Sequence, residues 1–258
     1  MNDKHLRNVT AAILLLVPVA FNTLFTLLSV MFEYPDILRQ PAADVLARFD
    51  EGGNALIATW YGFMLTAVMF VPLAILVWKV LAPTSSSVLA LSAAFGVVAG
   101  VVQFLGLVRW PFLVPYLADA YLDPESSAAT KEAVLVVFES FNRFAGVGIG
   151  ENLGYLFTAL WTLCIAFAVL ASKMRYNRWV GVMGVIAAGG ILAGMLEPAG
   201  VEVAADVVVI GYIVWSVWLI VLGVLILRLP GSAGGRGLAR GARRPFPHTE
   251  TSGHLSTS

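Results

Sequence analysis

The sequence predicts an all-α, polytopic integral membrane protein with six transmembrane helices and with both termini in the cytoplasm (N-in/C-in). Apolar residues make up 59% of the 258 residues and charged residues only 12%, a balance outside the usual range of soluble domains. Six apolar stretches each approach or exceed the roughly 20 residues that a helix needs to cross a bilayer. Basic residues gather at alternate connections between these stretches, as the positive-inside rule requires.

The six predicted spans form one membrane domain, 9–228, between a short cytoplasmic N-terminus, 1–8, and a C-terminal tail. The spans cover residues 9–32, 55–81, 88–108, 153–171, 179–196 and 207–227. The first span follows Lys4 and Arg7, but its apolar run of 24 residues is too long for a signal peptide, so we expect a retained helix. The tail, 229–258, is rich in Gly, Arg and Ser and has little to bury, which predicts disorder.

The distribution of charge fixes the predicted orientation. With the N-terminus inside, eleven Lys and Arg residues but only two acidic residues fall on the cytoplasmic side. Five basic and fourteen acidic residues then fall outside or near the outer surface, so a formal net charge of zero hides a polarised protein. Twelve Arg against four Lys is typical of a GC-rich bacterial genome. We therefore expect a multi-pass protein of the bacterial inner (plasma) membrane.

The first outer connection predicts a short amphipathic helix on the outer face. Residues 41–49 begin with Pro41, which suits the first position of a helix. Asp44 and Arg48 stand four residues apart and are expected to pair. Gly52 and the glycine after it then end the helix.

The second outer connection predicts another amphipathic helix, from Ser127 to Ala145. Its apolar residues recur at helical spacing, and Glu139 and Arg143 are expected to pair on its polar side. Three glycines follow before the fourth span, and they predict a flexible break in the chain. These are Gly146, Gly148 and Gly150.

Spans three and five share a pattern of small and charged residues. The matching residues are Gly96, Gly106 and Arg109 in one span and Gly184, Gly194 and Glu197 in the other. In one interpretation, spans two and three and spans four and five are repeated hairpins related by an axis along the membrane normal. In the other, Gly96–Gly100 and Gly190–Gly194 are close-packing faces, because small residues let helix backbones approach.

Three stretches together resemble a known bacterial membrane family. They are Tyr34–Phe49 (YPDILRQPAADVLARF), Ser140–Trp161 (SFNRFAGVGIGENLGYLFTALW) and Gly190–Val201 (GILAGMLEPAGV). The family is the one catalogued as domain of unknown function 4386, and the resemblance extends from about Asn8 to Arg228. It implies a six-helix integral membrane protein and brings no established activity or catalytic residue with it.

Charged and amide side chains near the outer ends of the spans are the candidate ligand-binding residues, because charge at membrane depth is costly without a function. The candidates are Arg109, Glu139, Asn142, Arg143, Glu151, Asn152 and Glu197. We expect them to converge on an outward-facing polar vestibule, with an ion pair between Arg109 and Glu197. The alternative is that they are interfacial anchors and helix ends.

Uncharged polar residues lie deeper in the predicted spans. They are Asn22, Thr66, Gln103, Thr162 and Ser216. Hydrogen bonds between helices are their expected use, and a polar translocation path is the alternative. No ionisable residue lies at the middle of a span, which argues against a proton-driven pump.

The sequence predicts no metal, no cofactor and no catalytic residue. The three histidines, His5, His248 and His254, all lie in the tails, so the membrane domain lacks a histidine ligand or base. Cys164 stands among apolar residues and is interpreted as a small buried side chain. No glycine loop precedes a Lys-Ser or Lys-Thr pair, as nucleotide binding would need. We therefore expect a protein that is not an enzyme.

The leading hypothesis is non-catalytic binding of a small amphipathic molecule or lipid at the outer vestibule, as a sensor, carrier or resistance element. Its expected partners are membrane lipids and that ligand, and no nucleic acid. One alternative is an accessory or scaffold subunit that docks another membrane protein through its Gly-rich helix faces. A second alternative is a membrane-embedded lipid enzyme.

Overall fold

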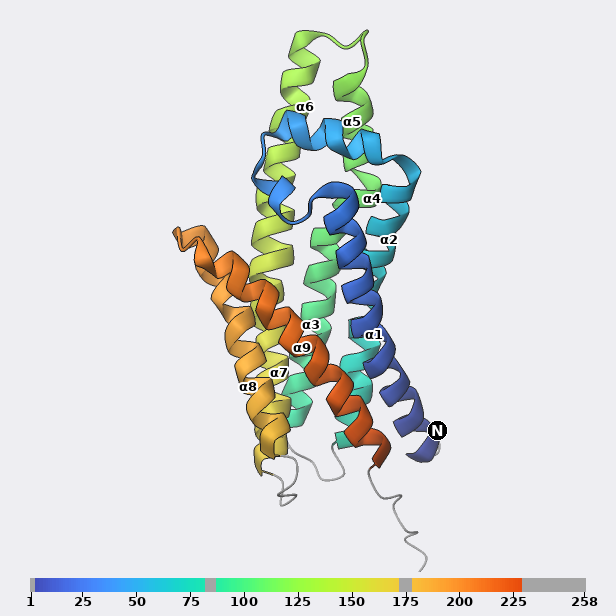
Figure 1. Cartoon of the computed structure of the whole chain (residues 1–258), viewed down its shortest axis with the longest axis vertical. Helices are drawn as coiled ribbons and strands as arrows, with labels where there is room; N and C mark the ends of the chain where they lie inside the picture. Colours follow the sequence, from blue (N-terminus) through green and yellow to red (C-terminus); the bar gives the residue numbers. More distant parts are fainter. Residues whose placement is uncertain (1–2, 82–86, 172–177, 229–258) are drawn as a thin grey trace, which may run out of the picture. The chain divides into compact units, whose positions relative to one another are not determined.

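The structure, a computed structural model, describes residues 3–81, 87–171 and 178–228, and every regular element in these ranges is helical (Figure 1). The elements are α1 (Asp3–Phe32), η1 (Asp36–Arg39), α2 (Ala42–Leu81), α3 (Ser87–Leu107), α4 (Arg109–Phe112), α5 (Val114–Leu122), α6 (Ala128–Phe141), η2 (Asn142–Leu153), α7 (Gly154–Ala171), α8 (Arg178–Ala193), η4 (Gly194–Ala199) and α9 (Val203–Arg228).

Six of the helical segments are long and apolar enough to cross a membrane, which confirms the predicted number of spans. The long helices form a closed ring, in which neighbours along the chain pack together and α9 returns to α1. Large apolar side chains on the outside of the ring stay exposed, as contact with lipid requires; Val30, Ile186 and Ile210 are each 60% or more exposed. The predicted tail, 229–258, lies outside the described residues.

One end of the bundle carries α4, α5 and α6, and the first residues of α1 and the last of α9 lie at the opposite end (Figure 1). We call the former the α5–α6 end. Neither α4 nor α5 is among the predicted elements, since the third predicted span ends at residue 108. Proline is tolerated in the first turn of a helix, and Pro115 occupies that position in α5.

A sharp kink at Gly53 folds the start of α2 across the α5–α6 end (Figure 1). Gly53 has φ 53° and ψ −151°, a combination that is essentially restricted to glycine. The residues from Ala42 to the kink are helical, as predicted for this connection, and Val45, Leu46 and Phe49 are buried. The predicted Asp44–Arg48 pair is wrong: Arg48 pairs with Glu51 and Glu33 instead, because a helix kinked at Gly53 brings the end of α1 beside it.

The second predicted helix begins where the sequence indicated, because the Ser127 side chain accepts a hydrogen bond from the Thr130 backbone N–H at 3.1 Å. The flexible break predicted at its end is wrong. The chain continues through a π-helix, η2, into α7 without interruption. The glycines there allow close packing instead: a Cβ on Gly150 would lie 2.8 Å from the Gly106 Cα of α3.

Glycines in α3 and α8 pack against other helices of the same chain. A Cβ on Gly100 would lie 2.7 Å from the Val71 side chain of α2, and one on Gly190 would lie 2.8 Å from the Gly211 Cα of α9. The close-packing interpretation of these faces is therefore confirmed.

Candidate functional site

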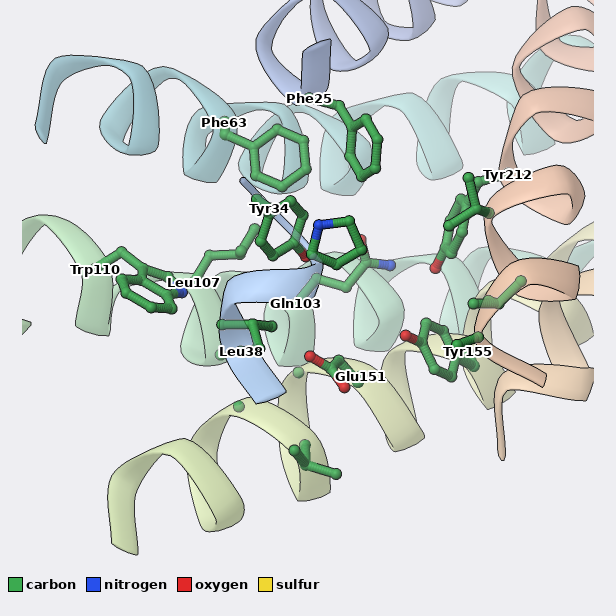
Figure 2. A pocket seen from close by; sticks show the side chains of 18 of the residues that line it. Phe25, Tyr34, Leu38, Phe63, Gln103, Leu107, Trp110, Glu151, Tyr155 and Tyr212 are labelled. Carbon is green, nitrogen blue, oxygen red and sulfur yellow. The ribbon is translucent and has the colours of Figure 1, made fainter. Parts of the chain in front are cut away.

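A cavity of about 410 Å³ lies inside the ring of helices. Side chains from α1, η1, α2, α3, α4, η2, α7, η4 and α9 line it. Figure 2 shows it from close by, with Glu151 on one side, Phe25 and Phe63 on the opposite side, and Tyr212 beside them. Its size falls within the usual range of small-molecule sites, roughly 300–1,000 Å³.

Aromatic rings form one wall of the cavity. Phe21 stacks on Phe63 with ring centroids 5.1 Å apart, and its ring lies 5.8 Å from that of Tyr212. Phe25 meets the ring of Tyr34 edge-on at 5.5 Å. Burial raises the pKa of the Tyr34 phenol, and the negative charge of Glu151 raises it further. Tyr34 therefore stays protonated at neutral pH and can donate a hydrogen bond into the cavity.

Glu151 brings a carboxylate to the wall opposite these rings. It belongs to η2, the π-helical segment between α6 and α7. Within the described residues the Glu151 carboxylate accepts no hydrogen bond and forms no ion pair. The hydroxyl groups of Tyr155 and Tyr212 point into the same space (Figure 2). The cavity thus combines aromatic rings, tyrosine hydroxyls and one carboxylate that has no hydrogen-bond or ion-pair partner within the described residues.

Arg109 forms a largely enclosed part of the wall, and its side chain is only 7% exposed. It donates a hydrogen bond to the Gly106 carbonyl and another, at 3.0 Å, to the Asn142 side-chain oxygen. Its guanidinium carbon lies 5.1 Å from the ring centroid of Trp110, within the range of a cation–π contact. Gly146 makes room for it, because a Cβ there would lie 2.7 Å from that carbon.

An exposed ion pair lies at the edge of the cavity. Arg39 of η1 donates to the Glu197 carboxylate of η4 at 2.8 Å and also contacts Asp36. The predicted pair between Arg109 and Glu197 is therefore wrong. The first connection folds over the end of the bundle and brings Arg39 to Glu197, while the Arg109 side chain contacts Asn142 and Gly146 of η2.

Two amides from the predicted spans also line the cavity. Gln103 donates to the Thr158 hydroxyl and Asn22 to the Ser216 hydroxyl, each at 2.8 Å. The expected hydrogen bonds between helices are confirmed for these residues and for Thr162, whose hydroxyl accepts from the Trp215 indole. Thr66 differs, because its hydroxyl donates to the Phe63 carbonyl of its own helix.

Four of the seven predicted site residues line the cavity: Arg109, Asn142, Glu151 and Glu197. Asn152 lies on an adjoining hollow of about 210 Å³ that shares Glu151 and Glu197 with the main cavity. The remaining two, Glu139 and Arg143, are exposed, and no ion pair joins them within the described residues. The expected pair between them is therefore wrong.

The aromatic residues of the cavity are not among the site residues that the sequence predicts. Tyr34 lies in a motif that carried the family resemblance, and Tyr155 and Tyr212 stand in apolar spans where interfacial aromatic residues are common. No spacing rule separates a ring that faces a cavity from one that faces lipid. The described residues also hold no group of three His, Cys, Asp or Glu side chains that could bind a metal ion.

These features define a multi-pass, six-helix membrane protein with an internal, aromatic-lined cavity that contains a few polar groups. The chain belongs to the family described as Domain of unknown function (DUF4386), whose family model matches residues 9–223. No curated protein and no solved structure matches the chain.

Proposed function

We propose that this protein is a non-catalytic membrane protein that binds one small amphipathic molecule or lipid in the cavity, as a sensor, carrier or resistance element. The observation that carries the proposal is that an aromatic wall faces a carboxylate inside a cavity of about 410 Å³. Ligand sites are typically concave and mostly apolar, with a few polar groups that fix orientation. Rings such as Phe25 and Phe63 would hold the apolar part of the ligand, and Glu151 and the tyrosine hydroxyls would hold its polar part.

We further propose that the cavity faces the outside of the bacterial inner membrane. The sequence places an excess of acidic residues in the connections at the α5–α6 end and an excess of basic residues in those at the other end. The positive-inside rule assigns the basic side to the cytoplasm. In this orientation both termini are cytoplasmic, and Arg39 and Glu197 lie at the outer edge of the cavity.

Filling the cavity tests the proposal. Val209 of α9 lines the cavity, whereas its neighbour Ile210 is 60% exposed on the outside of the bundle. We expect native mass spectrometry of the wild type and of Ile210→Trp to retain a bound species, and Val209→Trp to lose it. Extraction of that species would then identify it.

Two results would contradict the proposal. One is a wild type that carries no bound species and takes up no small amphipathic molecule. The other is a Val209→Trp protein that retains the same bound mass as Ile210→Trp, because a ligand in the cavity cannot share the space with the new indole.

A further inference from the structure

We infer that the cavity selects a hydrophobic organic cation, an amine or quaternary ammonium, whose charge lies between the Glu151 carboxylate and the aromatic wall. The inference rests on the proposed function, because it names the chemistry of the molecule that the cavity binds. The observations that carry it are the bonding state of each charged side chain around the cavity and the placement of the rings.

Glu151 is the charged side chain of the cavity that lacks a direct partner within the described residues. The other three that line it are engaged: Arg109 with Asn142 and a backbone carbonyl, and Arg39 with Glu197. Glu151 is half-buried, and a carboxylate that loses part of its hydration without gaining a hydrogen bond or an ion pair is costly. A cation that enters the cavity would supply the missing partner, which makes its binding favourable.

The aromatic rings opposite Glu151 also favour a positively charged ligand. The face of an aromatic ring carries negative potential and attracts ammonium groups within about 6 Å of its centroid. Phe25, Phe63, Tyr34 and Tyr212 surround the space on the side away from Glu151 (Figure 2). Several of these rings are close neighbours around the cavity. For example, the ring centroids of Tyr34 and Phe63 lie 6.3 Å apart. Recognition of quaternary ammonium ligands in other proteins uses this kind of aromatic enclosure.

An anionic ligand would have to disrupt existing bonds. To bind Arg109 it would have to displace the Asn142 side chain or the Gly106 carbonyl, and Arg109 is only 7% exposed. To bind Arg39 it would have to compete with Glu197. It would also face the negative charge of Glu151. The arrangement therefore disfavours an anion at each polar group.

Two probes of equal shape and opposite charge test the inference. Phenylpropyl trimethylammonium and phenylpropyl sulfonate share one apolar body and differ in the sign of the head group. Binding is measured by equilibrium dialysis with the full chain in dodecyl maltoside, an uncharged detergent. We expect the wild type to bind the cation at least about tenfold more tightly than the anion.

The substitution Glu151→Gln gives the decisive comparison, because it keeps the shape of the side chain and removes its charge. We expect it to weaken binding of the cation about 30-fold and to strengthen binding of the anion, since Arg109 then acts without an opposing carboxylate. A protein that merely misfolds loses both probes. Glu132→Gln is the matched control, because Glu132 is exposed on α6 outside the cavity and should bind as the wild type does.

Preference of the wild type for the anion, or equal cation binding by the wild type and Glu151→Gln, would overturn the inference. Failure to bind either probe would overturn it too. The proposed function is judged separately by the Val209→Trp experiment: a bound neutral or anionic species that is lost from Val209→Trp would leave the cavity a binding site with a different ligand class.

Discussion

Two groups of aromatic residues lie side by side near the α5–α6 end, and one is filled while the other is hollow. In the filled group, Trp60 and Trp110 stack with centroids 4.5 Å apart and planes 9° apart, and Phe32 and Phe49 pack around them. All four side chains are at most 2% exposed. The hollow group, formed by Phe21, Phe25, Tyr34, Phe63 and Tyr212, surrounds the cavity, and Trp110 of the filled group also lines it. The same residue types thus serve as core in one place and as a wall in the other.

The neighbours of each group account for the difference. The kink at Gly53 lays the start of α2 over the filled group and presses Phe49 onto Trp110. No segment of the described chain enters the hollow group in this way. Its rings face Glu151 and the tyrosine hydroxyls, which a dry, close-packed core would leave without partners. The aromatic cluster with apolar surroundings is therefore close-packed, whereas the cluster that faces polar groups borders a cavity.

The comparison is tested most strongly by removing one ring from each group. Trp60→Ala should lower the free energy of unfolding by about 3–5 kcal/mol, because the side chain is fully buried and leaves a cavity behind. Phe25→Ala should cost about 1 kcal/mol, because one side of that ring already faces open space. Reversible unfolding in mixed micelles measures both. Equal losses would mean that the hollow group is packed as tightly as the filled one.

A sharper test changes the space around Arg109. This side chain lies over the ring of Trp110 in the filled group and also lines the cavity. Gly146→Ala places a methyl group against its guanidinium and should cost about 1–3 kcal/mol of stability by overpacking. Gly148→Ala is the matched control. A Cβ at position 148 would meet only the Arg143 carbonyl, at 3.4 Å, so this helical alanine should be neutral or stabilise by up to about 1 kcal/mol. Thermal unfolding of both variants in one detergent measures the difference.

If Gly146→Ala and Gly148→Ala shift the unfolding temperature equally, the stability of the protein does not depend on the position of Arg109 in the cavity wall. Opposite signs would show that the glycine at 146 is required by the side chain it faces and not by the backbone of η2.

The sequence predicted the six spans because apolar runs of about twenty residues between polar connections match the thickness of a bilayer and rarely occur in soluble domains. It also placed Arg109, Asn142, Glu151 and Glu197 around one space, since charges at the same end of a bundle converge. It did not predict the partners of these charges. These partners depend on how the connections between the spans fold over the end of the bundle. The kink at Gly53 and the continuous η2 are decided by tertiary packing, which no local sequence pattern records.

The helical continuity of η2 illustrates this limit. Three glycines in five residues favour a break when the segment is considered alone. In the structure, Gly106 of α3 approaches Gly150 so closely that side chains there would not fit. The same glycines that weaken an isolated helix therefore allow the contact that orders it. The aromatic wall was beyond prediction for a similar reason, because its rings come from helices and a connection that meet only in the folded protein.

The smallest expected effect concerns the exposed edge of the hollow group. Arg39 and Glu197 are paired at 2.8 Å, but both side chains are more than a third accessible to solvent. Exposed ion pairs contribute at most about 1 kcal/mol. Glu197→Gln should therefore lower stability by less than about 1 kcal/mol, and the loss should shrink when Arg39→Gln is already present. A double-mutant cycle on unfolding free energies measures this coupling.

The outcome separates Arg39 from Arg109 as the partner of Glu197. A loss above about 2 kcal/mol that persists in the Arg39→Gln background would assign Glu197 to a shielded pair with Arg109, because breaking a buried pair leaves an uncompensated charge. A small loss that depends on Arg39 would place the pair at the rim, where water compensates for the missing bond. In that case the Arg39–Glu197 pair contributes little to the stability of the cavity wall.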